Sequence, residues 1–350
     1  MFKSLNRGIS APIAIIIIVV CALLVGGIVV YQYYGMPKEE KKTEEEIYIY
    51  KGIWLPSIPP IGWLTSNIPK MKELGMNTVF LSVGFLEEED NRLAGIDMSH
   101  IVEDIQIAHE NGLKVALTTG FRPPYPKLED LDLEVLNSLI IEVAELAEEY
   151  DVELFAPLNE PGAVLEEKTE EWRQEILLMI KEVYHGEIVW KGCGPDGEPR
   201  SEEFLKELSE GPPGDYVGYD YIGFTTLFVP SEGLTLEEYS QYVDNAIKYR
   251  LAQAERDNCK GVMFTEFGMG DRFVMRGSDV VDLIDDGTIT EEEFTRAHEI
   301  VFEKGKDMAV GFITTIDVLE TKIETESFEV HIRGIPETEE LIREWFKEIL

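Results

Sequence analysis

From residue 47 onward, short apolar segments alternate eight times with segments whose apolar residues recur at three- and four-residue spacing. The short segments are rich in β-branched and aromatic residues, as expected of strands buried on both faces of a parallel sheet. Strands joined by helical crossovers run parallel, and eight of them close naturally into a barrel. We therefore expect an α/β fold, a (β/α)8 or TIM barrel, with strands at 47–54, 77–83, 113–119, 152–158, 187–193, 221–228, 261–267 and 311–318.

The intervening segments carry helix stop signals. The pattern IPKMKELGMN stops at Gly75 and the pattern HIVEDIQIAHEN stops before Gly112, and glycine is favoured just past a helix end. An open doubly wound sheet is the alternative architecture. That fold usually has a glycine-rich turn after its first strand, and GIWLPSIPP at this place is not such a turn. The closed barrel is therefore favoured.

The N-terminal segment has no charged residue from Gly8 to Met36. Residues 11–30 are almost continuously apolar, and a helix of this length, rising about 1.5 Å per residue, crosses a hydrocarbon core of roughly 30 Å. A cleaved secretory signal has a shorter apolar region, of about 7–15 residues. Lys3 and Arg7 precede the run and acidic residues follow it, so the positive-inside rule keeps the N-terminus in the cytoplasm. We expect a single-pass anchor in the cell membrane, with the rest of the chain outside the cell.

Three regions follow from these patterns. Residues 1–35 form the cytoplasmic tip and transmembrane anchor, residues 36–46 form a charged linker, and residues 47–350 form one barrel domain. The text NRGISAPIAIIII also resembles the N-terminus of archaeal pilin-like precursors, which are processed after a basic residue and a glycine. That resemblance covers only this short segment, and it leaves processing of the N-terminus open.

The net charge of −37 argues against nucleic acid as a partner and suits a neutral or cationic substrate. The cysteines give no zinc or redox spacing: Cys21 lies in the apolar run, and Cys193 and Cys259 are expected to be buried thiols. There is no histidine cluster to suggest a catalytic metal. We expect a monomer without cofactor or metal.

Two glutamates directly follow apolar strands. The fourth strand ends in FAPLNEPG, with Asn159 and Glu160 at its mouth, and the seventh ends in FTEFGMG, with Glu266. Active-site residues of a (β/α)8 barrel sit at the carboxyl ends of its strands, and strands four and seven lie nearly opposite each other. A pair of carboxylates about 5–5.5 Å apart performs retaining glycoside hydrolysis.

These two strand ends resemble those of clan A glycoside hydrolases, retaining (β/α)8-barrel enzymes that act on β-linked sugars. The resemblance implies that Asn159 holds the sugar 2-hydroxyl, that Glu160 is the protonated acid/base, and that Glu266 is the ionised nucleophile. The stretch KMKELGMNTVFLSVGF is similar to the second-strand region of mannanase-like members. The chain is thus expected to be a glycosidase with a carbohydrate substrate.

Further residues near the strand ends are candidates for substrate binding. Trp54 and Trp190 could stack on sugar faces, and Arg122 could replace the basic residue that the clan usually has near strand two. Asp317 could orient a group of the site. Two departures from the clan stand out: IGFTTLFVP lacks the usual aromatic hydroxyl or imidazole of strand six, and ITTIDV lacks the tryptophan of strand eight.

A structural reading of the same residues remains open. Glu160 could cap a helix that begins at Pro161, Glu266 could pair with a lysine, and each tryptophan could simply pack in the core. The alternative function is a carbohydrate-binding or cell-surface barrel without catalysis. Finally, DLIDDGTITEEE at 282–293 is close to calcium-loop spacing, but Ile284 occupies a ligand position, so we expect instead a helix capped by Thr290 with Glu293.

The anchor can be tested by expressing the chain with and without residues 11–30. Because these residues alone are long and apolar enough to span the bilayer, the full chain should sediment with membranes and the truncated chain should stay in the soluble fraction. N-terminal sequencing of the native protein is the second measurement. A mature N-terminus beyond Val30 contradicts a retained anchor.

Overall fold

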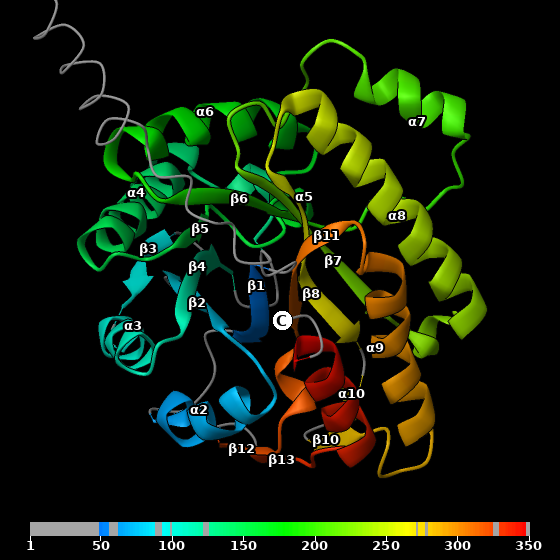
Figure 1. The fold of residues 1–350 in the computed structure, drawn as a ribbon. Coiled ribbons are helices and arrows are strands. Elements are labelled where there is room, and N and C mark those ends of the chain that lie inside the picture. Colours follow the sequence, from blue (N-terminus) through cyan, green and yellow to red (C-terminus); the bar gives the residue numbers. More distant parts are fainter. Residues whose placement is uncertain are drawn as a thin grey trace, which may run out of the picture. The chain divides into compact units, whose positions relative to one another are not determined.

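The computed structural model describes residues 49–55, 62–87, 93–98, 100–121, 126–270, 272–276, 279–324 and 329–347. Eight parallel strands close into a barrel, because the first strand pairs with both the second and the last. This closure confirms the (β/α)8 prediction and excludes the open doubly wound sheet (Figure 1). In order around the ring the strands are β1 (Tyr50–Leu55), β2 (Thr78–Glu87), β4 (Lys114–Gly120), β5 (Leu154–Ala156), β6 (Glu187–Gly192), β7 (Tyr221–Phe228), β8 (Gly261–Met269) and β11 (Ala309–Thr314).

Helices surround the barrel, as the alternating pattern predicts (Figure 1). Gly75 and Gly112 lie just past the first two of them with φ angles of 80° and 73°, which glycine adopts without strain. The helices are α2 (Trp63–Glu73), α3 (Ile101–Glu110), α4 (Leu133–Glu149), α5 (Gly162–Leu165), α6 (Thr169–Val183), α7 (Glu202–Ser209), α8 (Leu236–Asp257), α9 (Glu291–Gly305) and α10 (Pro336–Lys347), with short 3-10 turns η2 (Leu128–Asp130), η3 (Glu166–Lys168), η4 (Pro230–Glu232) and η5 (Ile316–Val318).

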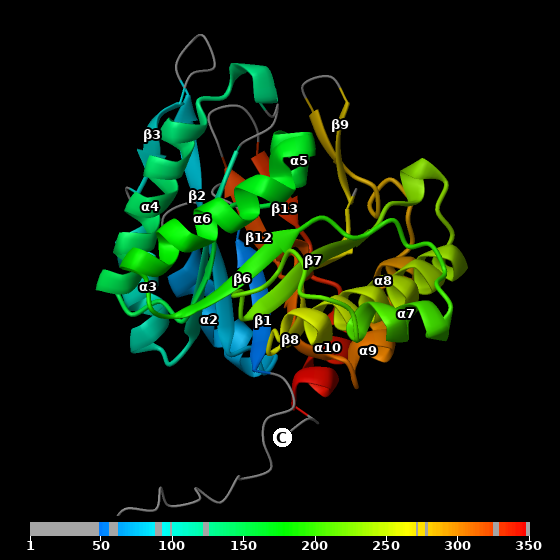
Figure 2. The ribbon, with the colours of Figure 1, turned by 90° about the horizontal axis from the view of Figure 1, so that it is seen from above.

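Three hairpin elements lie beyond the eight units that the sequence predicts. β3 (Leu93–Asp97) pairs antiparallel with the end of β2, β9 (Phe273–Arg276) pairs with β10 (Asp279–Asp282), and β12 (Thr321–Glu324) pairs with β13 (Glu329–Ile332). Each follows the carboxyl end of a barrel strand. Figure 2 shows β3, β9, β12 and β13 together with α5 on the same side of the molecule. The loops that frame this end of the barrel are therefore partly built as sheet.

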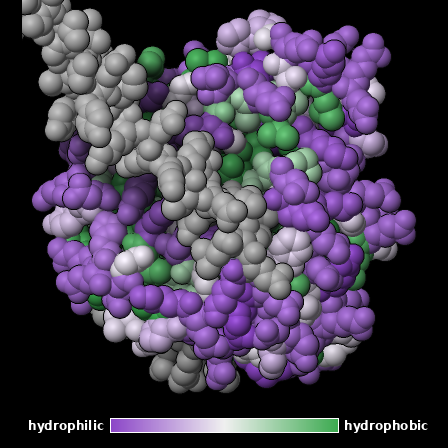
Figure 3. Space-filling model, in the orientation of Figure 1, coloured by the Kyte–Doolittle hydropathy of each residue, from purple (hydrophilic) through white to green (hydrophobic). Residues whose placement is uncertain are grey.

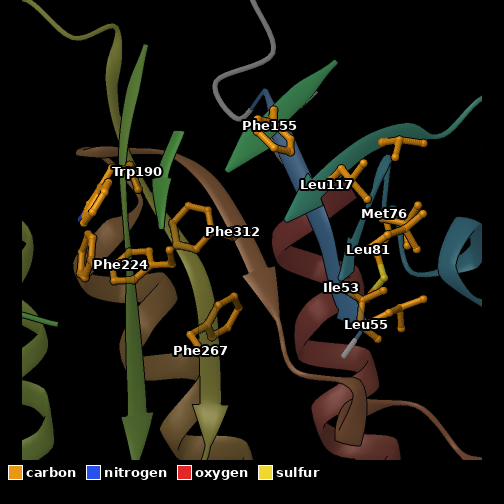
Figure 4. Packing of buried hydrophobic residues seen from close by; sticks show 14 of the residues in the cluster. Ile53, Leu55, Met76, Leu81, Leu117, Phe155, Trp190, Phe224, Phe267 and Phe312 are labelled. Carbon is orange, nitrogen blue, oxygen red and sulfur yellow. The ribbon is translucent and has the colours of Figure 1, made fainter. Parts of the chain in front are cut away.

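The buried side chains form two layers, because successive residues of a strand point to opposite faces. The inner cluster fills the barrel and comprises Tyr50, Phe80, Ala116, Leu154, Ala156, Val189, Tyr221, Met263 and Ile313. The outer cluster lies between barrel and helices, and Figure 4 shows part of it, including Phe155, Phe224, Phe267 and Phe312. A strand residue that belongs to the inner cluster therefore points into the barrel, and one that belongs to the outer cluster points toward the helices.

Strand β8 breaks this alternation once. Phe264 and Phe267 both belong to the outer cluster although they are three residues apart. The register explains this: Phe224 and Thr225 of β7 pair with Phe264 and Glu266, so Thr265 is an extra residue. The pairing with β11 shifts at the same place. This β-bulge reverses the facing of the residues after it and turns Glu266 inward.

Several sequence expectations are decided by the remaining structure. The 282–293 segment does form the predicted capped helix start, with Thr290 and Glu293 making a reciprocal capping box. The expectation of two buried thiols is wrong for Cys193, which is exposed just after β6, while Cys259 is half-buried. β5 ends at Ala156, two residues before the expected end of that strand, and β11 ends at Thr314, which leaves Asp317 outside the strand at 311–318 to which the pattern assigned it.

The membrane prediction falls outside the described residues, as do the linker at 36–46 and Arg122. Within the described ranges, no helix combines the length and apolar character needed to cross a membrane. The face shown in Figure 3 is mostly hydrophilic where it is coloured, in keeping with the strong negative charge of the chain.

Gly223 on β7 is needed because the bulge brings Thr265 against it. A Cβ atom at this glycine would lie 2.4 Å from Cγ2 of Thr265 and 2.9 Å from the carbonyl oxygen of Trp190. Gly223→Ala should therefore lower the free energy of unfolding by about 1–3 kcal/mol through overpacking. Urea unfolding followed by circular dichroism measures this. Gly162→Ala, where a Cβ meets no atom within 4 Å, is the matched control, and an equal effect of the two changes would contradict the close contact at the bulge.

Candidate active site

The segment after β5 holds Asn159 and Glu160 by its backbone. The Asn159 N–H donates to the carbonyl oxygen of Thr119 at 2.8 Å, and the Glu160 N–H donates to that of Lys191 at 3.0 Å. The chain thus continues to bond to both neighbouring strands after β5 has ended. Glu160 has a φ of 48°, in the left-handed region that costs a non-glycine residue energy. Both side chains are partly buried at the carboxyl end of the barrel.

Glu266 reaches the same end of the barrel through the bulge in β8. The residue is 8% exposed, and its side chain faces the interior, because Oε2 accepts a hydrogen bond from the inward-pointing Lys191 at 3.0 Å. The Lys191 ammonium also donates to Asn159, so Glu266 and Asn159 lie together at the carboxyl end of the barrel. Glu160, in the segment after β5, is near enough for its charge to act on the Glu266 carboxyl group of β8.

Lys191 is the centre of this site, and the sequence reading did not single it out as a functional residue. Its side chain is fully buried, and its Nζ donates to Oδ1 of Asn159 and to Oε2 of Glu266. Two signals in the sequence could have found it: a lysine in the apolar strand EIVWKGC, and its place two residues after the inward-facing Val189. The open alternative that Glu266 pairs with a lysine is therefore confirmed.

The aromatic candidates are divided by the structure. Trp54, at the end of β1, lies in the site, because the Lys191 ammonium sits over its ring at 4.9 Å from the centroid. That face of the ring is covered by the lysine. Trp190 points the other way, into the outer cluster (Figure 4). It is 2% exposed and packs edge-on against Trp172 and Tyr219. Trp190 is thus a packing residue and is not brought together with the other candidates.

Glu160 contributes to the start of α5 through its backbone and not through its side chain. α5 is preceded by Pro161, and no side chain caps it. The carbonyl oxygen of Glu160 accepts from the Ala163 N–H at 3.0 Å. The Glu160 carboxyl group is therefore not engaged as the cap of α5.

Burial raises the pKa of the Glu266 carboxyl group above its usual range. The ammonium of Lys191 opposes this shift, while the charges of Glu160 and Asp317 act in the same direction as burial. From the sequence we expect the proton of the pair on Glu160, with Glu266 ionised. The structure adds a reason for a proton to favour Glu266 as well, and makes Lys191 the group that counteracts it.

Asp317 lies in η5, behind the site. It accepts a hydrogen bond from the Thr315 hydroxyl, and its carbonyl oxygen accepts from Nη1 of Arg272 at 2.7 Å. Arg272 is itself fully buried, pairs with Asp282 at 2.9 Å, and donates to the carbonyl oxygen of Arg333 at 2.8 Å. One arginine thus ties the loop after β8 to the two segments that flank β12 and β13.

β7 is the sixth strand of the barrel, where the sequence departs from the clan pattern. Thr225 of β7 pairs in register with Glu266, and its hydroxyl is buried with no hydrogen-bond partner in the described part of the chain. A threonine hydroxyl thus lies on the strand next to the predicted nucleophile, where the clan usually has an aromatic hydroxyl or imidazole. Among the described residues, no group of three or more histidine, cysteine or acidic side chains could hold a metal ion.

Comparison with known proteins gives a structural likeness without a sequence match. No protein-family model and no curated protein matches the chain. Among solved structures, the fold is similar to a GH113 β-mannanase from Alicyclobacillus acidocaldarius (TM-score 0.57, 16% identity, 87% of this chain and 98% of that one). It is also similar to a GH53 catalytic domain from Ignisphaera aggregans (0.55, 14%, 87% and 96%) and to an endo-β-1,4-mannanase from Thermotoga petrophila (0.54, 13%, 86% and 77%). The chain therefore has the (β/α)8-barrel fold of these glycoside hydrolases.

The buried Asp317 gives a pH-dependent stability that can be measured. Burial raises the pKa of Asp317 to about 6, from 3.8 for an exposed aspartate. The folded state therefore binds this proton more tightly than the unfolded state, and the resulting stability is lost as the pH rises from about 4 through 6. Between pH 4 and pH 7, Asp317→Asn should gain up to about 3 kcal/mol in unfolding free energy relative to the parent. Urea unfolding at each pH tests this, with the exposed Asp307→Asn as matched control, and a difference that is constant with pH contradicts it.

Proposed function

We propose that the chain is a retaining glycoside hydrolase that cleaves β-linked poly- or oligosaccharides. The observation that most supports this is the convergence of Asn159, Glu160 and Glu266 at the carboxyl end of a closed (β/α)8 barrel. Glu266 and Glu160 are close enough for the charge of one to affect the protonation of the other. The shared fold with glycoside hydrolases agrees with this assignment, and mannan is the first substrate to test because two of the similar structures are named as β-mannanases.

The reaction would proceed by double displacement. Glu266 attacks the anomeric carbon through a carboxylate oxygen while Glu160 protonates the departing glycosidic oxygen, which leaves a glycosyl ester on Glu266. Glu160, now ionised, then takes a proton from water, and the resulting hydroxide attacks the same carbon and releases Glu266. Asn159 donates a hydrogen bond to the 2-hydroxyl of the sugar. Trp54 forms part of the wall on the β1 side.

A carbohydrate-binding barrel without catalysis is the second candidate, and one observation favours it. Lys191 forms an ion pair with Oε2 of Glu266, one of the two oxygens of the carboxylate that the hydrolase needs as a nucleophile. A binding protein would bind β-linked oligosaccharides without releasing reducing ends. Isothermal titration together with a reducing-sugar assay on the same preparation separates the two functions.

We also propose that the barrel works outside the cell, held to the membrane by residues 11–30. The support for this is the sequence alone: a charge-free apolar run preceded by basic residues and followed by an acidic linker. A membrane-held hydrolase at this position would act on polymers that cannot enter the cell.

Glu266→Ala tests the role of the nucleophile. On an aryl β-glycoside that the parent cleaves, this change should lower kcat about 10⁴-fold or more, because no glycosyl ester can form. Added azide should restore cleavage and give a glycosyl azide of inverted configuration, detected by NMR. Near-normal activity of Glu266→Ala contradicts the assignment.

Glu160→Ala tests the acid/base separately. Formation of the glycosyl ester should be nearly unaffected for substrates with good leaving groups, which need little protonation, while polysaccharide cleavage falls about 10²- to 10⁴-fold. Glu299→Ala, a partly exposed glutamate on α9, is the control and should behave as the parent. Equal losses on activated and natural substrates would assign Glu160 another role.

A further inference from the structure

Lys191 makes a contact pattern that the two-glutamate reaction does not by itself require. Its ammonium group has three N–H donors, of which one goes to Oδ1 of Asn159 and another to Oε2 of Glu266. The ring of Trp54 covers the same group, and the side chain is 0% exposed. One cation thus touches the proposed nucleophile and the proposed sugar-binding amide, and it is shielded from water.

The orientation of Lys191 is determined by its strand. Val189 and Lys191 face the barrel interior, and Trp190 between them is locked into the outer layer by Trp172 and Tyr219. The Arg173 guanidinium lies over the outer face of Trp190, 4.5 Å from the ring centroid. A rotation of this strand segment would have to expel Trp190 from its packing, so Lys191 is held pointing into the site.

We propose that Lys191 is a positioning residue of the hydrolase, which aligns Glu266 for attack and sets the orientation of the Asn159 amide. This inference rests on the proposed function, since it gives Lys191 a part in that reaction. The lysine itself does not reach the sugar, because its ammonium is enclosed by Asn159, Glu266 and Trp54.

The effect on Asn159 follows from the chemistry of the two groups. A lysine ammonium only donates hydrogen bonds, so the amide must present its oxygen to Lys191. The amide NH₂ is then directed away from Lys191 and can donate to a sugar hydroxyl. Without the cation, the amide could turn over and offer an acceptor in place of a donor.

The effect on Glu266 is electrostatic and geometric. Lys191 holds Oε2, which leaves Oε1 as the attacking atom. Among the described residues, charges that act on this carboxyl group come from Lys191 on β6, Glu160 after β5 and Asp317 in η5. Only Lys191 among these three favours the ionised form, so its loss removes the counterweight to burial and raises the pKa of Glu266 further.

The test compares Lys191→Met and Lys191→Arg in the full chain. Lys191→Met keeps an unbranched apolar stem of four heavy atoms but removes the ammonium group, so kcat/KM should fall about tenfold or more. The acid limb of its pH profile should also move about one pH unit or more to higher pH, because Glu266 then ionises less readily. Lys191→Arg retains the charge and should keep the acid limb close to that of the parent. Circular dichroism first establishes that each variant is folded.

A second measurement does not depend on turnover. A double-mutant cycle of Lys191→Met and Glu266→Gln, followed by urea unfolding, should give a coupling that is present at pH 7 and shrinks as the pH is lowered and Glu266 takes up a proton. If the parent is active but Lys191→Met leaves kcat/KM and the acid limb unchanged, the inference is overturned and the hydrolase stands. If the parent protein neither cleaves nor binds any β-linked sugar, the proposed function fails. The double-mutant cycle alone then decides whether Lys191 controls the ionisation of Glu266.

Discussion

The closure of eight parallel strands into a ring is the constraint on which the rest of this structure depends. Because each strand has neighbours on both sides, alternate side chains must enter the barrel or face the helices. The inner cluster fills the ring up to the level where Lys191 and Trp54 begin. Polar groups above that level lie at the carboxyl end, where Lys191 and Glu266 stand on strands β6 and β8 and Asn159 and Glu160 follow β5. The site is therefore placed by the barrel strands and by the segment that directly follows β5.

A single extra residue changes the character of β8. If β8 were regular, strict alternation from the outward-facing Phe264 would turn Glu266 outward, toward the helices, and Phe267 inward. The bulge turns it inward, and Gly223 provides the space that the Thr265 methyl group occupies. Bulges at barrel rims commonly re-aim a side chain in this way. The most consequential carboxylate of the site is thus positioned by an irregularity in an otherwise regular strand.

The charges around Glu266 balance burial against pairing. An isolated buried carboxylate is costly, and a buried lysine alone is costly as well, so each residue is tolerated because the other is present. Arg272 has a similar role in the loops: it is buried, paired with Asp282, and bonded to backbone oxygens from two other segments. Lys191 inside the ring and Arg272 in the loops around it are thus buried cations that organise this end of the barrel.

The local patterns of the sequence predicted the architecture and the two strand ends that carry Asn159, Glu160 and Glu266. They could do so because strands and helices differ in periodicity, and because functional side chains of such barrels follow the strands. The direction of the Trp190 side chain and the role of Lys191 were not predicted. Neighbouring residues of a strand point to opposite sides, and the sequence is compatible with either residue facing the interior. The sequence by itself thus determined the barrel and the ends of its strands. Only the tertiary structure decided which side chains meet. The direction of the Glu266 side chain depends on a register shift between β8 and its neighbours, and the sequence of one strand does not show how it pairs with another.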